Sequence, residues 1–220
     1  GSTGEFDNGN GALMRILPIS FYLFEHYQGD FLSSLEGFKV ACQTAAITHA
    51  HPRNITAVII YLAIAEDLIH ARLSKGGPLT FLQFRKAILK GSKRSIAFLE
   101  KNPLYRSQVP YFSKFFENPK TKKMHLETFR EPEIKSSGYV VDTLEAAVWG
   151  CLTSPDYKTC VLKTANLGDD ADTVAAVAGG LAGLAYGEKA FPSEWLKNMV
   201  DLTTIKELSL AYQSQLKFLK

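Results

Sequence analysis

The sequence predicts an all-α fold, arranged as a compact multi-helix single domain. Three observations favour this class. Helix start and stop signals occur almost throughout the chain, strand signals are sparse, and no internal repeat is present. With 220 residues, 46% of them apolar, the chain can bury a substantial core, which fits one domain over residues 1–220 or one domain with a small lobe.

The expected helices follow one another in order. Asn54 can cap a long helix that ends at Gly76 and Gly77, and Thr80 can open the next one. Thr143 precedes an apolar run to Leu152. Each of these positions combines a capping side chain with the apolar residues that a buried helix needs.

Further caps follow toward the end of the chain. Asp156 can cap a segment that reaches Asn166, and Ser193 can cap another. Thr204 and Glu207 form a capping-box pattern for the last helix. Loop-like tracts cover residues 1–11, 102–111 and 118–137, and we expect 117–137 to form a long surface loop or mobile excursion.

Charge and composition narrow the possible partners. The formal net charge is only +3, and the Lys and Arg residues between 85 and 123 alternate with apolar residues at helical spacing. A solvated basic face explains this pattern better than a nucleic-acid site, because no nucleic-acid motif accompanies it. We therefore expect no nucleic-acid partner.

The apolar run from Ile55 to Ala65 is interrupted by Glu66 and Asp67 and is expected to be a core helix, too short to span a bilayer. No membrane partner is expected. Three cysteines, an odd number without paired short spacing, favour a reducing compartment and a cytoplasmic location. The chain begins Gly-Ser without an initiator Met, so its first residues can be an artificial extension or a cleavage product.

The segment NLGDDADTVAAVAGG, residues 166–180, is the candidate metal site. Asp170, Asp172 and Thr173 can share one hard cation such as Mg²⁺, Mn²⁺ or Ca²⁺, because carboxylate and hydroxyl oxygens suit these ions. Ligands two residues apart can also point the same way where the chain is extended before a helix. Ordinary capping is the alternative, since Asp and Thr favour helix N-termini. An EF-hand is excluded, because Val174 and Leu181 stand where that loop requires an oxygen ligand and Glu.

The helix that follows consists almost entirely of Ala and Gly, although each Gly costs roughly 1 kcal/mol against Ala in a helix interior. Neighbouring elements must therefore pack closely around this helix. Such packing can also hold the acidic loop rigid.

Three other segments have candidate binding residues. Asp7-Asn8-Gly9-Asn10-Gly11 precedes an apolar helix and can cradle a phosphate with backbone N–H groups, or form a plain Asn-Gly turn. In THAHP, residues 48–52, the imidazoles can face a sugar or metal, or belong to a capped helix end. In SSGYVVDT, residues 136–143, Tyr139 can stack on a planar base or pack in the core.

In this order, the four segments resemble the ADP-ribosylglycohydrolase family, the group that includes dinitrogenase-reductase-activating glycohydrolase and the eukaryotic ADP-ribosyl-acceptor hydrolases. The matching blocks are NGNGALMRILP, ITHAHP, SSGYVVDTLEAAVW and NLGDDADTVAAVAGGLAGLAYG, spread between Asp7 and Gly187. The last block is the most specific.

The resemblance implies an all-α hydrolase that holds two divalent cations, usually Mg²⁺ or Mn²⁺, and cleaves ADP-ribose from an acceptor side chain or small molecule. Its expected partner is ADP-ribose or an ADP-ribosylated protein. Asp7 matches a position where some members carry a site acid and is the candidate catalytic residue. Asp169 stands where many members have Gly and is not assigned. The other implied site residues are Asp170, Asp172 and Thr173 for metal, Gly9, Asn10, Gly11 and Met14 along the diphosphate and ribose path, His49 near the ribose, and Ser137, Gly138 and Tyr139 at the adenine end.

The sequence also departs from the family pattern. Members normally carry a Gly-Asp-Ala motif and a Thr-Asp-Asp run that completes the metal site, and neither occurs before Asp7. The resemblance thus covers the C-terminal two-thirds of the pattern, and no general base is identified. We expect either a hydrolase that is completed by a missing N-terminal segment or chain, or a truncated, non-catalytic protein that binds ADP-ribose or nucleotide or acts as a scaffold.

Overall fold

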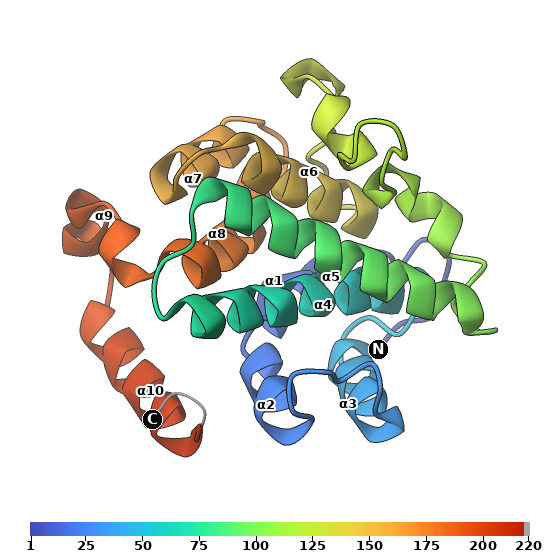
Figure 1. The fold of residues 1–220 in the computed structure, drawn as a ribbon, viewed down its shortest axis with the longest axis horizontal. Helices are drawn as coiled ribbons and strands as arrows, with labels where there is room; N and C mark the ends of the chain where they lie inside the picture. The colour runs from blue at the N-terminus through green and yellow to red at the C-terminus, as the bar shows by residue number, and fades with distance from the viewer. Residues whose placement is uncertain (218–220) are drawn as a thin grey trace.

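The computed structural model describes residues 1–217, which form an all-α fold with isolated β-bridges and no strand. This confirms the predicted fold class. The helices between residues 11 and 186 lie around one core (Figure 1), to which the two helices between residues 193 and 215 contribute no buried residue. In chain order they are α1 (Gly11–Ile16), α2 (Ile19–His26), α3 (Leu35–Ala46), α4 (Pro52–Lys75), α5 (Phe81–Lys101), α6 (Val140–Thr153), α7 (Tyr157–Ala165), α8 (Ala171–Tyr186), α9 (Ser193–Asn198) and α10 (Leu202–Gln215), with short 3₁₀ helices at Val109–Phe115, His125–Thr128, Glu131–Glu133 and Glu188–Ala190.

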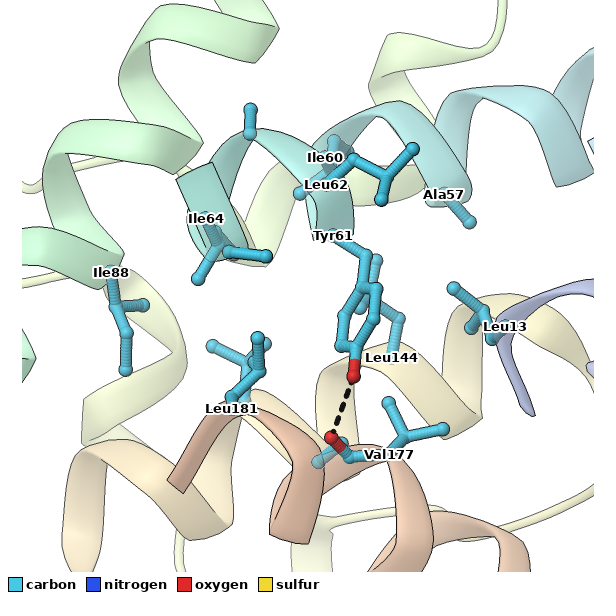
Figure 2. Close-up of a cluster of buried hydrophobic side chains, with 14 of the residues drawn as sticks. Leu13, Ala57, Ile60, Tyr61, Leu62, Ile64, Ile88, Leu144, Val177 and Leu181 are labelled. Atoms are coloured by element: carbon cyan, nitrogen blue, oxygen red, sulfur yellow. Dashed lines mark hydrogen bonds between the residues drawn. The ribbon is translucent and has the colours of Figure 1, made fainter. Parts of the chain in front are cut away.

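Helix α4 is the centre of the fold. Every residue from Arg53 to Ile69 is buried, because α3, α5, α6 and α8 all pack against it. A helix that is apolar on every side is stable only when it is enclosed in this way. Figure 2 shows Tyr61 reaching from α4 to α8, where its hydroxyl donates to the carbonyl oxygen of Val177 at 3.1 Å.

Helix α4 is longer than its apolar run suggested. By length and composition alone it is able to cross a membrane, but 89% of its apolar window is buried inside the fold. The prediction of a core helix is correct. The length-based reason for that prediction was wrong, because the helix extends beyond the apolar run at both ends and is long enough to span a bilayer. The helix continues through Glu66 and Asp67 because Arg94 of α5 pairs with both, at 2.6 and 3.2 Å, which offsets the cost of burying their charges.

Several predicted caps are confirmed. Thr80 forms a capping box with Gln83 at the start of α5, and Asp156 accepts a 2.8 Å hydrogen bond from the backbone N–H of Thr159 at the start of α7. Gly76 ends α4 in the left-handed region, with φ +69°, where Gly carries no steric cost.

Other predicted caps were wrong. His51, not Asn54, caps α4: its Nδ1 accepts from the backbone N–H of Arg53 at 3.1 Å, and Pro52 occupies the first helical position. Asn54 instead donates to the carbonyl oxygen of Gly9 at 2.6 Å. Helix α6 begins at Val140, so Thr143 lies in its first turn.

The caps near the end of the chain are also shifted. Pro192 precedes α9, so Ser193 is its first residue and not its cap. Asp201 caps α10 by accepting from the backbone N–H of Thr204, which replaces the predicted Thr204–Glu207 box. Asp201 stands three residues before the N–H of Thr204, which is the spacing of a helix N-cap, and it was overlooked as a competing cap.

The segment 117–137 lies at the surface as predicted, but it is anchored. Met124 and Leu126 are fully buried, and the indole N–H of Trp149 donates to the carbonyl oxygen of Phe129 at 3.0 Å. Two buried side chains and one partly buried hydrogen bond hold this segment against α6, which argues against a mobile excursion.

The small residues of α8 permit close packing, as expected. A Cβ atom at Gly180 would lie 2.6 Å from Leu17 Cδ2 and 2.9 Å from the Tyr61 hydroxyl. Helices α4, α6 and α7 pack against α8 on several sides. Helix α8 is thereby fixed, and with it the acidic loop at its start.

Cys42, Cys151 and Cys160 are free thiols. The cytoplasmic location inferred from the cysteine count stays a prediction.

Candidate functional site

Three of the four segments singled out in the sequence meet at the start of α1, α6 and α8. Gly9 and Tyr139 form an antiparallel bridge, and the backbone N–H of Asn10 donates to the carbonyl oxygen of Gly138 at 3.0 Å. On the other side of this turn, the N–H of Asp170 donates to the carbonyl oxygen of Ser136 at 3.1 Å. The turn at 136–139 therefore lies between the Asn-Gly segment and the acidic loop.

The Asn10 side chain joins all three segments. Its Nδ2 donates to Asp170 Oδ2 at 2.5 Å and to Thr143 Oγ1 at 2.8 Å. The Thr143 hydroxyl in turn donates to the carbonyl oxygen of Ser137 at 2.9 Å. Since a carboxylate only accepts hydrogen bonds, the amide nitrogen of Asn10 must face Asp170. Asn10 thus fixes the position of the predicted metal ligand.

Part of the predicted phosphate cradle serves the fold instead. The N–H of Asn10 is already bonded to Gly138, and the Asn10 side chain does not cap α1. The glycines beside it make room for His49, because a Cβ atom at Gly11 would lie 2.8 Å from His49 Cε1 and one at Gly9 would lie 3.4 Å from Nε2. The fourth segment therefore joins the same site.

The surroundings of His49 favour its neutral form. Burial lowers the pKa of His49, the nearby Arg15 guanidinium lowers it further, and the carboxylate of Asp7 opposes both effects. Its Nδ1 lies 2.9 Å from Thr48 Oγ1. A neutral imidazole can accept a hydrogen bond from a hydroxyl group. The resemblance implies that His49 lies near the ribose.

The acidic loop presents oxygen donors of the kind that a hard cation binds. Thr173 is buried, and its hydroxyl donates to Asp170 Oδ1 at 3.3 Å; Asp172 is exposed. Mg²⁺ often takes one or two carboxylates and completes its shell with water and substrate phosphates. The donor set fits this pattern, although within residues 1–217 no three His, Cys, Asp or Glu side chains come together as a metal site. Asp169, which was not assigned, has φ +54°, in the region that favours Gly.

The other predicted residues lie at the margin of the site. Asp7 is exposed and its carboxylate accepts from the backbone N–H of Gly4 at 3.2 Å. Met14 is 56% exposed. The Ser137 hydroxyl donates to Asp142 Oδ2 at 2.7 Å, which connects this turn to the first turn of α6. The functional roles of these residues stay predictions.

A pocket of about 440 Å³ opens beside Tyr139 and Gly138. Its wall contains residues that the sequence reasoning missed, above all Arg53, which pairs with Glu5 at 2.8 Å. Burial raises the pKa of Tyr139, and the neighbouring Arg53 guanidinium opposes this rise. The sequence did contain one signal that Arg53 has a special role. It places a cation at the start of a buried helix, where the helix dipole disfavours positive charge.

The ADP-ribosylglycohydrolase family model matches residues 1–217, so the chain belongs to this family. ADP-ribosyl-(dinitrogen reductase) glycohydrolase from Rhodospirillum rubrum is 29% identical over 204 residues, which is 93% of this chain and 54% of that protein. The chain therefore spans about half the length of this relative.

Two further relatives match over shorter stretches. ADP-ribosylarginine hydrolase Tri1 from Serratia proteamaculans (strain 568) is 46% identical over 80 residues, 36% of this chain and 22% of the relative. The protein of the same name from Pseudomonas putida (strain GB-1) is 49% identical over 77 residues, 35% and 21% of the two chains.

A solved structure named ADP-ribosylglycohydrolase-related protein complex is similar in fold. Its TM-score is 0.55 at 23% identity, and the match covers 96% of this chain and 61% of that one. This similarity supports the fold.

Proposed function

We propose that this chain supplies the ADP-ribose site and part of the metal site of a divalent-metal-dependent hydrolase, which removes ADP-ribose from an acceptor side chain or a small molecule. The observation that carries the proposal is the contact of Asn10 with Asp170 and Thr143. Through this contact, two segments that resemble family blocks converge on a third, the acidic loop.

The residues of the chain have distinct roles in this proposal. Asp170, Asp172 and Thr173 hold Mg²⁺ or Mn²⁺, which when bound orients the ribose hydroxyls and lowers the pKa of a water molecule. Gly9, Gly11 and Gly138 let the ligand approach the backbone, and His49 accepts from a ribose hydroxyl. Tyr139 stacks on the adenine ring. Asp7 assists substrate activation from the margin of the site.

Calorimetric titration of ADP-ribose, with excess Mg²⁺ and with EDTA, tests the proposal. We expect binding that requires Mg²⁺ and that is lost in Asp170→Asn. Asp169→Asn is the matched control, because it makes the same change one residue away at an exposed, unassigned position, and it should bind as wild type. Tight binding by Asp170→Asn contradicts the proposal.

Activity is measured separately as ADP-ribose released from ADP-ribosylarginine, the substrate class for which two of the relatives are named. Mg²⁺-dependent release supports a hydrolase. A protein that binds ADP-ribose equally well in EDTA and releases none supports the second candidate function, a non-catalytic ADP-ribose or nucleotide module. The lack of a three-residue acidic or His/Cys cluster within residues 1–217 favours this alternative.

A further inference from the structure

The pocket beside Tyr139 contains a charged pair to which the proposed reaction gives no role. Arg53 is 5% exposed, and its Nη1 donates to Glu5 Oε1 at 2.8 Å. Its Nε donates to Gln108 Oε1 at 3.1 Å, and its guanidinium lies 3.6 Å from the centre of the Tyr111 ring. The guanidinium is therefore fixed in place before any ligand arrives.

Glu5 is fixed as well, yet it stays accessible. Its side chain is 56% exposed, and its Oε2 lies 3.2 Å from His51 Nε2. Because Nδ1 of His51 accepts from the N–H of Arg53, the ring proton of neutral His51 is on Nε2 and is donated to Glu5. Arg53 holds the pKa of Glu5 below its ordinary value, so the carboxylate is charged at neutral pH.

The same pocket has surfaces that suit a planar ring. Phe6 lines it and is 100% exposed, which leaves a large apolar surface in water. Asn8, 3% exposed in the pocket wall, donates its amide nitrogen to the carbonyl oxygen of Glu5 at 2.8 Å, and its Oδ1 has no donor among the described residues. An aromatic ligand complements the exposed Phe6 ring.

We propose that Glu5 and Arg53 read the edge of the nucleobase and select a 6-aminopurine over a 6-oxopurine. This inference rests on the proposed function, which places the base of ADP-ribose beside Tyr139. The carboxylate only accepts hydrogen bonds and the guanidinium only donates them. A 6-aminopurine presents a donor, its amino group, next to an acceptor, ring nitrogen 1, and so complements both residues.

A 6-oxopurine reverses this pattern. It presents a carbonyl oxygen next to a ring N–H, so the oxygen faces the Glu5 carboxylate and the N–H faces the Arg53 guanidinium. Sites that hydrogen bond a substrate group reject analogues that leave their polar groups unpaired. Because Glu5 is partly solvated, we expect discrimination of about 10- to 100-fold, below the upper range of such sites.

The test compares the calorimetric affinities of ADP-ribose and inosine diphosphate ribose for the full chain in Mg²⁺. Wild type should favour ADP-ribose by at least about tenfold. In Glu5→Gln the amide both donates and accepts, so the preference should fall to about threefold or less. Glu194→Gln is the matched control, because it alters an ion pair of similar exposure, Lys158–Glu194, outside the pocket, and it should keep the wild-type preference.

Phe6→Ala separates base stacking from hydrogen bonding to the edge of the base. It should weaken both ligands by a similar factor of about five or more, because base stacking on an aromatic ring does not depend on the edge. Circular dichroism of each variant verifies the fold.

Equal affinities in wild type, or an unchanged preference in Glu5→Gln, overturns the inference. If ADP-ribose binds with Mg²⁺ dependence but without discrimination, the inference fails and the proposed function stands. If neither ligand binds, both fail.

Discussion

Nδ2 of Asn10 lies 2.5 Å from Oδ2 of Asp170, although the two residues are 160 positions apart in the sequence. The same nitrogen donates to Thr143 Oγ1 at 2.8 Å. A single amide thus connects the starts of α1, α6 and α8. The contact orients the acidic loop and also contributes to the stability of the fold.

Asn10→Ala should lower the free energy of unfolding by about 1–3 kcal/mol, because it leaves the Asp170 carboxylate and the Thr143 hydroxyl without their shared donor. Urea denaturation measures this loss. Asn198→Ala is the control, since the exposed Asn198 side chain donates only to a carbonyl oxygen of its own helix, and it should change stability by less than about 0.5 kcal/mol. A smaller effect for Asn10→Ala than for Asn198→Ala would show that the contact contributes nothing.

The sequence singled out the segments that converge in the structure, but it did not predict how they meet. Asn10, Gly138 and Asp170 each belong to a short segment of unusual composition, so the sequence was enough to single them out. The Asn10–Thr143 contact depends on where α6 begins, and Thr143 looked like a helix cap. Arg53 was missed because its role follows from the distant Glu5 and Tyr111, which no local pattern connects to it.

Tyr61→Phe should destabilise the protein by about 0.5–1.5 kcal/mol, since the Tyr61 hydroxyl is fully buried and donates to the Val177 carbonyl oxygen (Figure 2). Thermal unfolding measures the shift. Tyr212→Phe removes a similar bond, to the Pro18 carbonyl oxygen, from a side chain that is 37% exposed, and it should cost less because water replaces the lost partner. Equal losses in the two variants would argue that burial of the Tyr61 bond adds nothing.

The prediction of the fold succeeded where one residue decides the structure locally. Thr80, Asp156 and Gly76 were identified because each cap is complete within four residues. The prediction failed where a neighbouring residue competed. At α4 the His51-Pro52 pair displaced Asn54, whose side chain donates to Gly9 in another segment.

Gly91→Ala should lower stability by at least about 1 kcal/mol, although Ala is favoured over Gly in helices by roughly that amount. A Cβ atom at Gly91 would lie 2.6 Å from Ile64 Cα and 2.7 Å from the Ala63 carbonyl oxygen, so the backbones of α4 and α5 must separate. Gly179→Ala is the matched control on α8, because its Cβ would meet only side-chain atoms, the nearest at 3.4 Å, and it should be neutral or stabilising. A stable Gly91→Ala protein would contradict the close approach of α4 and α5.

His49 should titrate below its ordinary pKa of 6.5, because burial and Arg15 disfavour the imidazolium more than Asp7 favours it. NMR of the ring protons measures the midpoint, and His49→Gln assigns the signal. The folded state then binds the proton less readily than the unfolded state. Neutral His49 therefore contributes its full stability above about pH 6.5, and this contribution declines as the pH falls through that value toward the folded pKa. Stability measured between pH 7 and 5 should accordingly decline less steeply in His49→Gln than in wild type, whereas a midpoint at or above 6.5 would mean that Asp7 dominates the surroundings of this imidazole.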